Sequence, residues 1–432
     1  DQFRGGIPLD AGVSKDEITR WHLRWAIKGW LDSHPASILW HSKQLLKVAP
    51  RPRPTDLELL GFLLEQAGDY GWAAELYGIA AEAIIMKSGG ANYDAADLLE
   101  HAMLTNYNAD RFDRAIEAGE SSLSMRRSLF SDQHLIVART LYGIALVQKA
   151  RSSFDDAERA LWESMEICRK FIGGTDSFEF TLRLREHARL SMANNDADGM
   201  ARDYQRYVDI YRRNGRGLDP ACLEAQLNLS QYHIDRGAIE AAKYCLESAR
   251  KIGRTHQDDS SLLMARKVVL ERLLSLMREK VADQDVDSLK SLLEESIAVI
   301  QQLRGNHDTE YGALNLQLGS VLLQTGSPVK SVPYFQESIA AVAESSLSIG
   351  PRIGLAEALY QMGEIDEAKQ EAESAVAAGT PMELDSPQIY EYERALQVCA
   401  GICFKSGDVD RAEELLQQAI KISVERDGVK SH

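Results

Sequence analysis

The sequence has 432 residues, of which 44% are hydrophobic and 26% charged, and its formal net charge is -16. This composition is typical of a folded, soluble protein and excludes a disordered or membrane-spanning chain. The acidic balance argues against nucleic acid as a partner, because phosphate binding needs a basic surface.

Residues 1–54 differ in composition from the rest of the chain. They hold nine Lys and Arg against five Asp and Glu (net +4), whereas the remaining 40 basic and 60 acidic residues give a net charge of -20. Ser14 and Glu17 have the spacing of a capping box that opens a helix, and a second helix is predicted over 36–48. Four of the six tryptophans lie in this segment: Trp21, Trp25, Trp30 and Trp40. We therefore expect a basic, tryptophan-rich segment at 1–54 and a second domain at 55–432.

The role of this first segment has two interpretations. Pro50, Pro52 and Pro54 alternate with arginines and form a stiff break before the second domain. The segment is either a cap that packs its tryptophans on that domain, or a basic aromatic element that docks on an acidic partner or a membrane surface. The chain begins at Asp1 without a methionine and without the apolar run of a signal peptide, so we expect a processed form or part of a longer protein.

An internal repeat of about 42 residues runs through the second domain. Several stretches share an apolar helix, a short turn with Gly or Asp, an apolar residue and an Ala three residues later, as in LGFLLEQAGDYGWAAELYGIAAEA. We call the residue two positions after the turn Gly, or its equivalent, the reference residue. The reference residues are Tyr70, Phe112, Phe154, Ala197, Ile239, Val286, Pro328, Ile365 and Val409. They are spaced 42, 42, 43, 42, 47, 42, 37 and 44 residues apart, which predicts nine units.

Small residues recur at two places relative to the reference residue. Alanine stands three positions after it in six of the nine units, and ten positions after it in four. Small side chains there would let the two helices of a unit cross closely. One helix pair cannot bury both of its apolar faces, so we expect neighbouring units to stack into a continuous core.

This pattern resembles the tetratricopeptide repeat (TPR). The period of 42 residues is similar to that of the kinesin light chain subtype, and LNLSQYHIDRG at 227–237 is close to that subtype's first-helix pattern. The resemblance covers about 55–425. Units one, five, eight and nine match best, whereas units four and six match mainly by spacing. It implies an all-α superhelix, a TPR solenoid of about nine helix-turn-helix repeats with an N-terminal helical cap.

The resemblance also implies a binding surface, because the first helix of each TPR unit lines a concave groove that usually holds a peptide. Matching the family's inward positions to this sequence gives Tyr107, Asn108, Arg139, Tyr142, Lys149, Arg185, Arg189 and Asn228. In the family, the asparagine that matches Asn228 contacts peptide backbone. Since arginine binds carboxylates with its planar fork, we expect an extended acidic segment or a free C-terminus as ligand. The alternative is that these cations pair with Glu100, Glu186 and Glu224 on the same or adjacent helices.

The sequence contains no motif for catalysis or for a cofactor. GxxxxGK[ST], GxGxxG, HExxH and GxSxG are all absent, so we expect no enzyme activity and no cofactor. His34 and His41 could share a helix face, but a solvated pair is preferred to a metal site because no third ligand lies nearby. Cys399 and Cys403 are interpreted as small buried residues rather than as a thiol pair or half of a metal site.

The function predicted from the sequence is that of a non-catalytic scaffold or adaptor for a protein or peptide partner. Two alternatives remain open: the sensory part of a larger signalling protein, and a structural subunit of a large assembly. The cysteine pattern favours a reducing compartment, so we expect a soluble intracellular location in the cytoplasm or an organelle.

Overall fold

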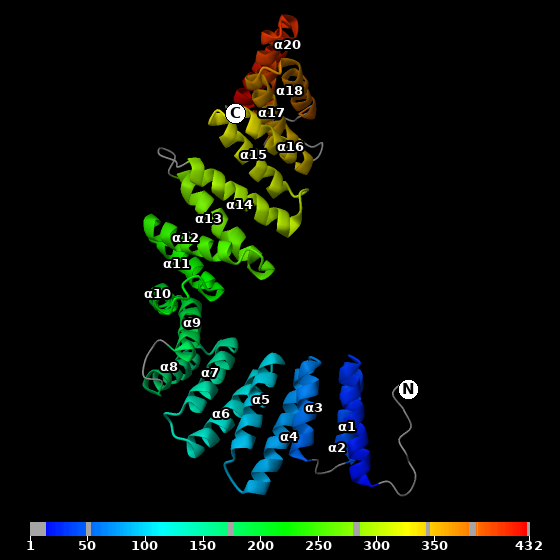
Figure 1. Ribbon diagram of the computed structural model, residues 1–432, viewed down its shortest axis with the longest axis vertical. Helices are drawn as coiled ribbons and strands as arrows, with labels where there is room; N and C mark the ends of the chain where they lie inside the picture. Colours follow the sequence, from blue (N-terminus) through cyan, green and yellow to red (C-terminus); the bar gives the residue numbers. More distant parts are fainter. Residues whose placement is uncertain are drawn as a thin grey trace. The chain divides into compact units, whose positions relative to one another are not determined.

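The computed structural model describes residues 14–48, 53–171, 177–279, 286–342, 346–379, 386 and 388–429. In these residues the secondary structure is entirely helical, with short 3-10 helices and no strand (Figure 1). The predicted all-α fold is therefore confirmed. The chain divides into two compact units, Asp1–Gly217 and Leu218–His432, which are described separately.

Within each unit, helices that are consecutive in sequence pack against each other. The first unit contains α1 (Lys15–Leu31), α2 (Pro35–Val48), α3 (Pro54–Gln66), α4 (Tyr70–Ser88), α5 (Tyr93–Asn108), α6 (Phe112–Leu129), α7 (Leu135–Ala150), α8 (Phe154–Phe171), α9 (Phe178–Ala193) and α10 (Ala197–Arg213). The second unit contains α11 (Leu223–Asp235), α12 (Ile239–Thr255), α13 (Leu263–Glu279), α14 (Val286–Arg304), α15 (Thr309–Gln324), α16 (Pro328–Val342), α17 (Ile349–Met362), α18 (Ile365–Ala378), α19 (Ile389–Lys405) and α20 (Val409–Val429). All nine reference residues are the first residues of even-numbered helices, from α4 to α20.

The turn inside each repeat has a fixed backbone conformation. Two positions before the reference residue, the φ angle is positive in eight repeats, and the corresponding position of the sixth repeat lies outside the described residues. Five of these positions are glycine, which adopts this left-handed conformation without strain. The other three are Asp110, Ser152 and Asn195, with φ of 57°, 65° and 59°. The short turn that follows directs the second helix back along the first.

Where the two helices of a repeat cross, a large side chain on one helix faces a glycine on the other. In the first repeat, a Cβ on Gly61 would lie 2.9 Å from the ring of Tyr77, which is seven residues after the reference residue. The seventh repeat has the same arrangement, with Phe335 on Gly319. The second repeat inverts it, because Gly119 of α6 leaves the space that Met103 of α5 fills. The helices therefore cross closely because one side of each contact is small.

Serine takes the place of alanine ten positions after the reference residue in some repeats. Ser122 and Ser338 are buried, and each donates a 2.7 Å hydrogen bond to a carbonyl of the preceding helix, that of Ala96 or of Gly312. Ser164 donates to the carbonyl of Ala138 in the same way. These bonds satisfy a hydroxyl that would otherwise be buried at a cost, so serine is tolerated at a position of close crossing.

Helices α1 and α2 pack on the first repeat. Ala26, Ile38 and Leu45 belong to one apolar cluster with Leu57 and Leu60 of α3. The predicted capping box is present, since Ser14 accepts from the Glu17 amide and Glu17 accepts from the Ser14 amide. The helix predicted over 36–48 begins one residue earlier, at Pro35.

A buried histidine pair lies between α1 and α2. His22 and His41 place their Nδ1 atoms 3.0 Å apart, and the rings of Trp21, Trp25 and Trp40 surround His41. The expectation that His34 and His41 form a solvated pair is wrong, because His41 is buried and pairs with His22, whereas His34 is exposed. Such a bond needs one ring as donor and the other as acceptor, so both rings cannot be protonated while it persists. Burial lowers the pKa of both histidines, that of His41 to about 4.

Replacing Ser152 by glycine should stabilise the protein. The left-handed conformation costs a non-glycine residue about 1 kcal/mol, and glycine would remove that cost. We expect the free energy of unfolding to rise by about 1 kcal/mol, measured by urea denaturation. Ser121→Gly, inside helix α6, is the matched control and should lower it by a similar amount. Destabilisation by Ser152→Gly would contradict the assigned role of this turn.

Acid should loosen the α1–α2 pair. Because the folded state lowers the pKa of His41, the histidine pair stabilises fully above its ordinary pKa of 6.5, and the stabilisation is lost as the pH falls towards 4. Tryptophan fluorescence should therefore change over this range, since three tryptophans surround the pair. His41→Gln should remove most of this change, whereas His307→Gln, at an exposed histidine, should retain it. An unaltered transition in His41→Gln would contradict the assignment.

Candidate functional site

Seven of the eight predicted binding residues lie in the first unit. They come from three first helices of successive repeats: Tyr107 and Asn108 from α5, Arg139, Tyr142 and Lys149 from α7, and Arg185 and Arg189 from α9. The eighth, Asn228, lies on α11 of the second unit. The predicted cations of the first unit, Arg139, Lys149, Arg185 and Arg189, fall into two separate groups.

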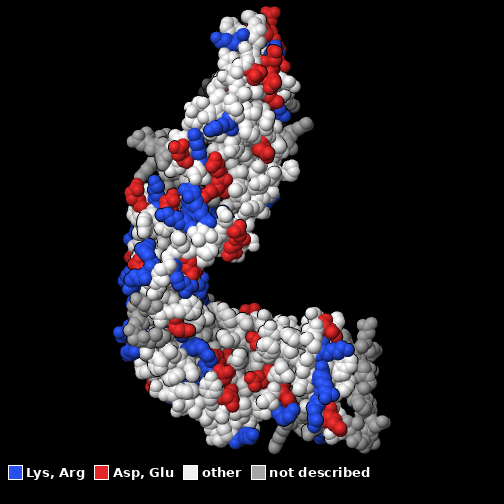
Figure 2. Space-filling view, viewed as in Figure 1, with Lys and Arg blue, Asp and Glu red and all other residues white. Residues whose placement is uncertain are grey.

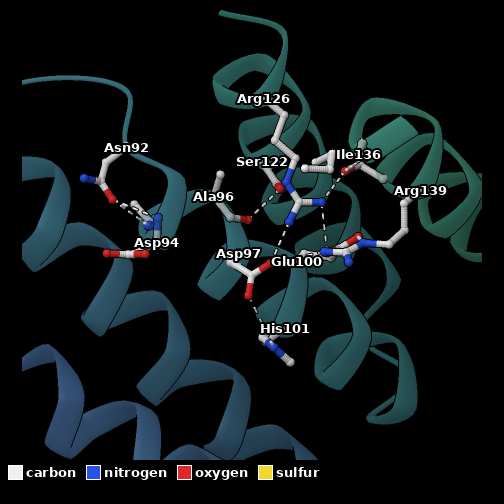
Figure 3. A network of polar contacts seen from close by, with 12 residues as sticks. Asn92, Asp94, Ala96, Asp97, Glu100, His101, Ser122, Arg126, Ile136 and Arg139 are labelled. Carbon is white, nitrogen blue, oxygen red and sulfur yellow. Dashed lines mark hydrogen bonds and ion pairs between the residues drawn. The ribbon is translucent and has the colours of Figure 1, made fainter. Parts of the chain in front are cut away.

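The first group is built around a buried arginine (Figure 3). Arg126 of α6 is fully buried, and its guanidinium lies 2.9 Å from Asp97 and 2.9 Å from Glu100, both on α5. It also donates a 2.7 Å hydrogen bond to Thr140 of α7. The side chain of Arg126 thus joins the first helices of two consecutive repeats.

Arg139 of α7 completes this group from the solvent side. Its guanidinium lies 2.5 Å from Glu100 and 3.1 Å from Asp97. The hydrogen bonds that it donates to Glu100 raise the pKa of Arg139. Two arginines face two carboxylates, so the group is neutral and the charge of Arg139 is compensated within the protein. For this residue, pairing with Glu100 is what the structure shows.

The second group surrounds Glu186 of α9, a buried carboxylate. Lys149 Nζ of α7 lies 2.7 Å from it, and Arg189 lies 2.6 Å from it. Arg185 is more distant: its Nε is 3.8 Å from Glu186 and has no hydrogen-bond partner, although it is buried. Lys149 and Arg185 alone exceed the charge of Glu186 by one, and both side chains remain partly exposed.

Tyr142 lies beside this second group. The guanidinium of Arg183 stands 5.1 Å from the centre of its ring. Burial raises the pKa of Tyr142, and the negative charge of Glu186 adds to this effect. The phenol therefore stays protonated at neutral pH and can donate a hydrogen bond to a ligand.

Tyr107 and Asn108 are not brought into either group. They lie at the end of α5, where the ring of Tyr107 packs near Phe112 of the next helix, at 6.2 Å between centroids. Within the described part of the chain, the hydrogen bonds of Glu100 and Glu186 go to other residues, such as Arg139 and Lys149. Arg126, which was not among the residues predicted from the sequence, anchors the first group. Arg183, also not predicted, contacts the ring of Tyr142 and pairs with Glu179 rather than with Glu186.

A hollow of about 310 Å³ lies on the corresponding helices of the second unit. Residues of α15, α17 and α19 line it together with Phe335 of α16, and Phe335 and Ile353 are among its apolar walls. Arg394 donates to both carboxylate oxygens of Glu357 there, at 3.0 and 3.1 Å. The hollow thus combines apolar walls with an internally paired charge.

Among the described residues, no group of three or more His, Cys, Asp or Glu side chains could hold a metal ion. Cys399 and Cys403 are both buried, and burial raises the pKa of Cys399 to about 12. A raised pKa lowers the fraction of thiolate, which is the reactive form of cysteine, at neutral pH. No described helix is long and apolar enough to cross a bilayer.

Removing Arg126 should destabilise the protein strongly. Arg126→Met would leave the buried Glu100 and its neighbour Asp97 with one arginine for two carboxylates, at a cost of about 3–5 kcal/mol. Arg139→Met, at the exposed side of the same group, should cost about 1 kcal/mol or less. The two variants can be compared by urea denaturation, and equal losses would contradict the role given to Arg126.

A family model described as tetratricopeptide repeat matches residues 94–170. This segment comprises nearly all of α5 to α8 and includes the buried Arg126 group. No curated protein matches the chain.

Several solved structures are similar at low identity. BtubC (BKLC) from P. vanneervenii shares 18% identity over 57% of this chain and 93% of its own, with a TM-score of 0.42. A putative kinesin light chain protein of TPR-like repeats from Podosopora anserina shares 19% over 47% and 96%, with a TM-score of 0.41. The apo quorum sensor NprR from B. thuringiensis shares 13% over 78% and 90%, with a TM-score of 0.40. These likenesses carry no argument about function. Residues 94–170 thus match the tetratricopeptide repeat family, and helix pairs of the same kind recur on both sides of this segment.

Proposed function

We propose that the chain is a non-catalytic scaffold that binds an extended acidic peptide segment, or a free C-terminus, at the Glu186 group. The observation that carries the proposal is the unequal charge of the two groups in the first unit. Arg126 and Arg139 are balanced by Asp97 and Glu100, whereas Lys149 and Arg185 share Glu186.

The geometry suits a carboxylate ligand. Glu186 holds Lys149 in place, and Arg185 keeps a buried Nε without a hydrogen-bond partner. A ligand carboxylate near both cations would neutralise the positive charge that Glu186 alone leaves uncompensated. Tyr142 adds an aromatic face and a protonated hydroxyl beside them. Tyrosine and arginine are enriched among the residues that dominate binding at protein interfaces.

Only some of the binding residues predicted from the sequence belong to the proposed site. Arg139 is neutralised by Glu100, so we expect it to contribute to stability rather than to ligand binding. Tyr107, Asn108 and Asn228 remain candidate contacts for the parts of an extended ligand beyond the Glu186 group.

Reversing the two cations should weaken binding of acidic peptides. Lys149→Glu/Arg185→Glu should lower the affinity for a fluorescent peptide of alternating Glu and small residues at least tenfold, a loss of about 1.4 kcal/mol or more. Anisotropy titration measures it, with free and amidated C-termini compared.

The control is Arg159→Glu/Arg169→Glu, which makes the same charge change at two exposed arginines of α8. This control should bind the peptide as well as the wild type. If both double variants lost the same affinity, the loss would follow from the change in net charge, and this result would contradict the proposed site. Failure of the wild type to bind any of the acidic peptides would contradict the proposed ligand class.

A further inference from the structure

Helix α20 exposes a position that the other second helices bury. Seven residues after the reference residue, the side chain or glycine is buried in each of the first eight repeats. These residues are Tyr77, Gly119, Leu161, Tyr204, Leu246, Leu293, Phe335 and Ala372. In α20 the same position is Leu416, which is 45% exposed. The following helix covers this face in the earlier repeats of each unit, and α20 has no such helix among the described residues.

Leu416 is part of an apolar stripe along α20. Ile420 and Val424 follow it at intervals of four residues and are 61% and 66% exposed, and Val409 precedes it on the same face. The equivalent of Ile420 in α18 is Val376, which is buried. Stacked helical repeats bury their apolar faces against neighbouring helices, so an exposed aliphatic stripe indicates a surface that another helix covers. The exposed carboxylates of Asp410 and Glu413 lie at the N-terminal end of this stripe.

Helix α1 exposes basic and aromatic side chains, which complement the acidic and aliphatic side chains of α20. Arg20, Arg24 and Lys28 recur at intervals of four residues and are all exposed, and no described residue forms an ion pair with them. Trp21 and Trp25 lie along the edge of this basic face, half-buried, and the ammonium of Lys28 stands 4.7 Å from the centre of the Trp25 ring. Figure 2 shows basic side chains gathered over α1 and acidic side chains over the α18–α20 region.

We propose that the exposed face of α20 binds helix α1 of a second copy of the chain. The aliphatic stripe of α20 would pack on Trp21 and Trp25, and Lys28 would approach Asp410 and Glu413 if the two helices run antiparallel, as consecutive helices joined by short turns do. The second copy thereby fills the place that the first helix of a following repeat occupies elsewhere in the array. This contact uses two different surfaces, so it is heterologous and joins copies head to tail. It is independent of the Glu186 group.

The test uses the full chain and two variants, each altered on one surface. The α1 variant is Arg20→Glu/Arg24→Glu/Lys28→Glu, and the α20 variant is Leu416→Lys/Ile420→Lys. Sedimentation velocity from about 1 to 100 µM should show the wild type growing in size with concentration, because contacts of this kind are populated in that range. Each variant alone should remain monomeric. Their equimolar mixture should form a dimer and nothing larger, because one intact α20 meets one intact α1.

Three results would overturn the proposal. A monomeric wild type over the whole range excludes the contact. Self-association of the α1 variant would show that α20 pairs with something other than α1, such as a second α20. A mixture that stays monomeric would exclude a contact between these two surfaces. The control Trp162→Lys/Tyr244→Lys changes two exposed aromatic residues elsewhere and should associate like the wild type. Circular dichroism should show the same helix content in all four proteins.

Discussion

The close crossing of two helices within each repeat is the constraint on which the rest of the structure depends. A helix pair can approach only if a small residue faces a large one, as Gly61 faces Tyr77 and Gly119 faces Met103. The inversion between these repeats shows that the sum of the two volumes matters more than which helix carries the larger side chain. With this distance fixed, the left-handed residue in the turn and the buried alanine or serine further along take the same places in most repeats.

Much of the architecture could be predicted from this regularity. The reference residues identified by spacing are the first residues of the second helices, even in the fourth and sixth repeats, which matched the family pattern mainly by spacing. The positive φ of Ser152 could not be predicted from residue type, because serine rarely adopts it; only the register of neighbouring glycines indicates it. The pairing of His22 with His41 depends on how α1 packs against α2, which helical periodicity does not determine.

The candidate site was predictable at the level of helices but not of charge balance. Sequence spacing places Arg139, Lys149 and Arg185 on the first helices of successive repeats. It does not reveal that Arg126, from a second helix, reaches between α5 and α7 and supplies half of the charge that neutralises Asp97 and Glu100. Whether a cation is available to a ligand therefore depends on residues of the opposite helix. Arg139 and Lys149 lie on the same helix, yet the charge of Arg139 is balanced within its group, whereas Lys149 shares one carboxylate with Arg185.

The position of Arg126 also bears on how the array can bend. An αα-array changes its curvature by small rotations between neighbouring repeats, and each rotation shifts one first helix relative to the next. Between α5 and α7 such a rotation would pull Arg126 away from Asp97 and Glu100 on one side or from Thr140 on the other. These bonds lie in a buried environment, where breaking them is costly. Repeats two and three should thus behave as a stiff segment, and deformation under load or on ligand binding should concentrate at junctions that lack a buried arginine of this kind.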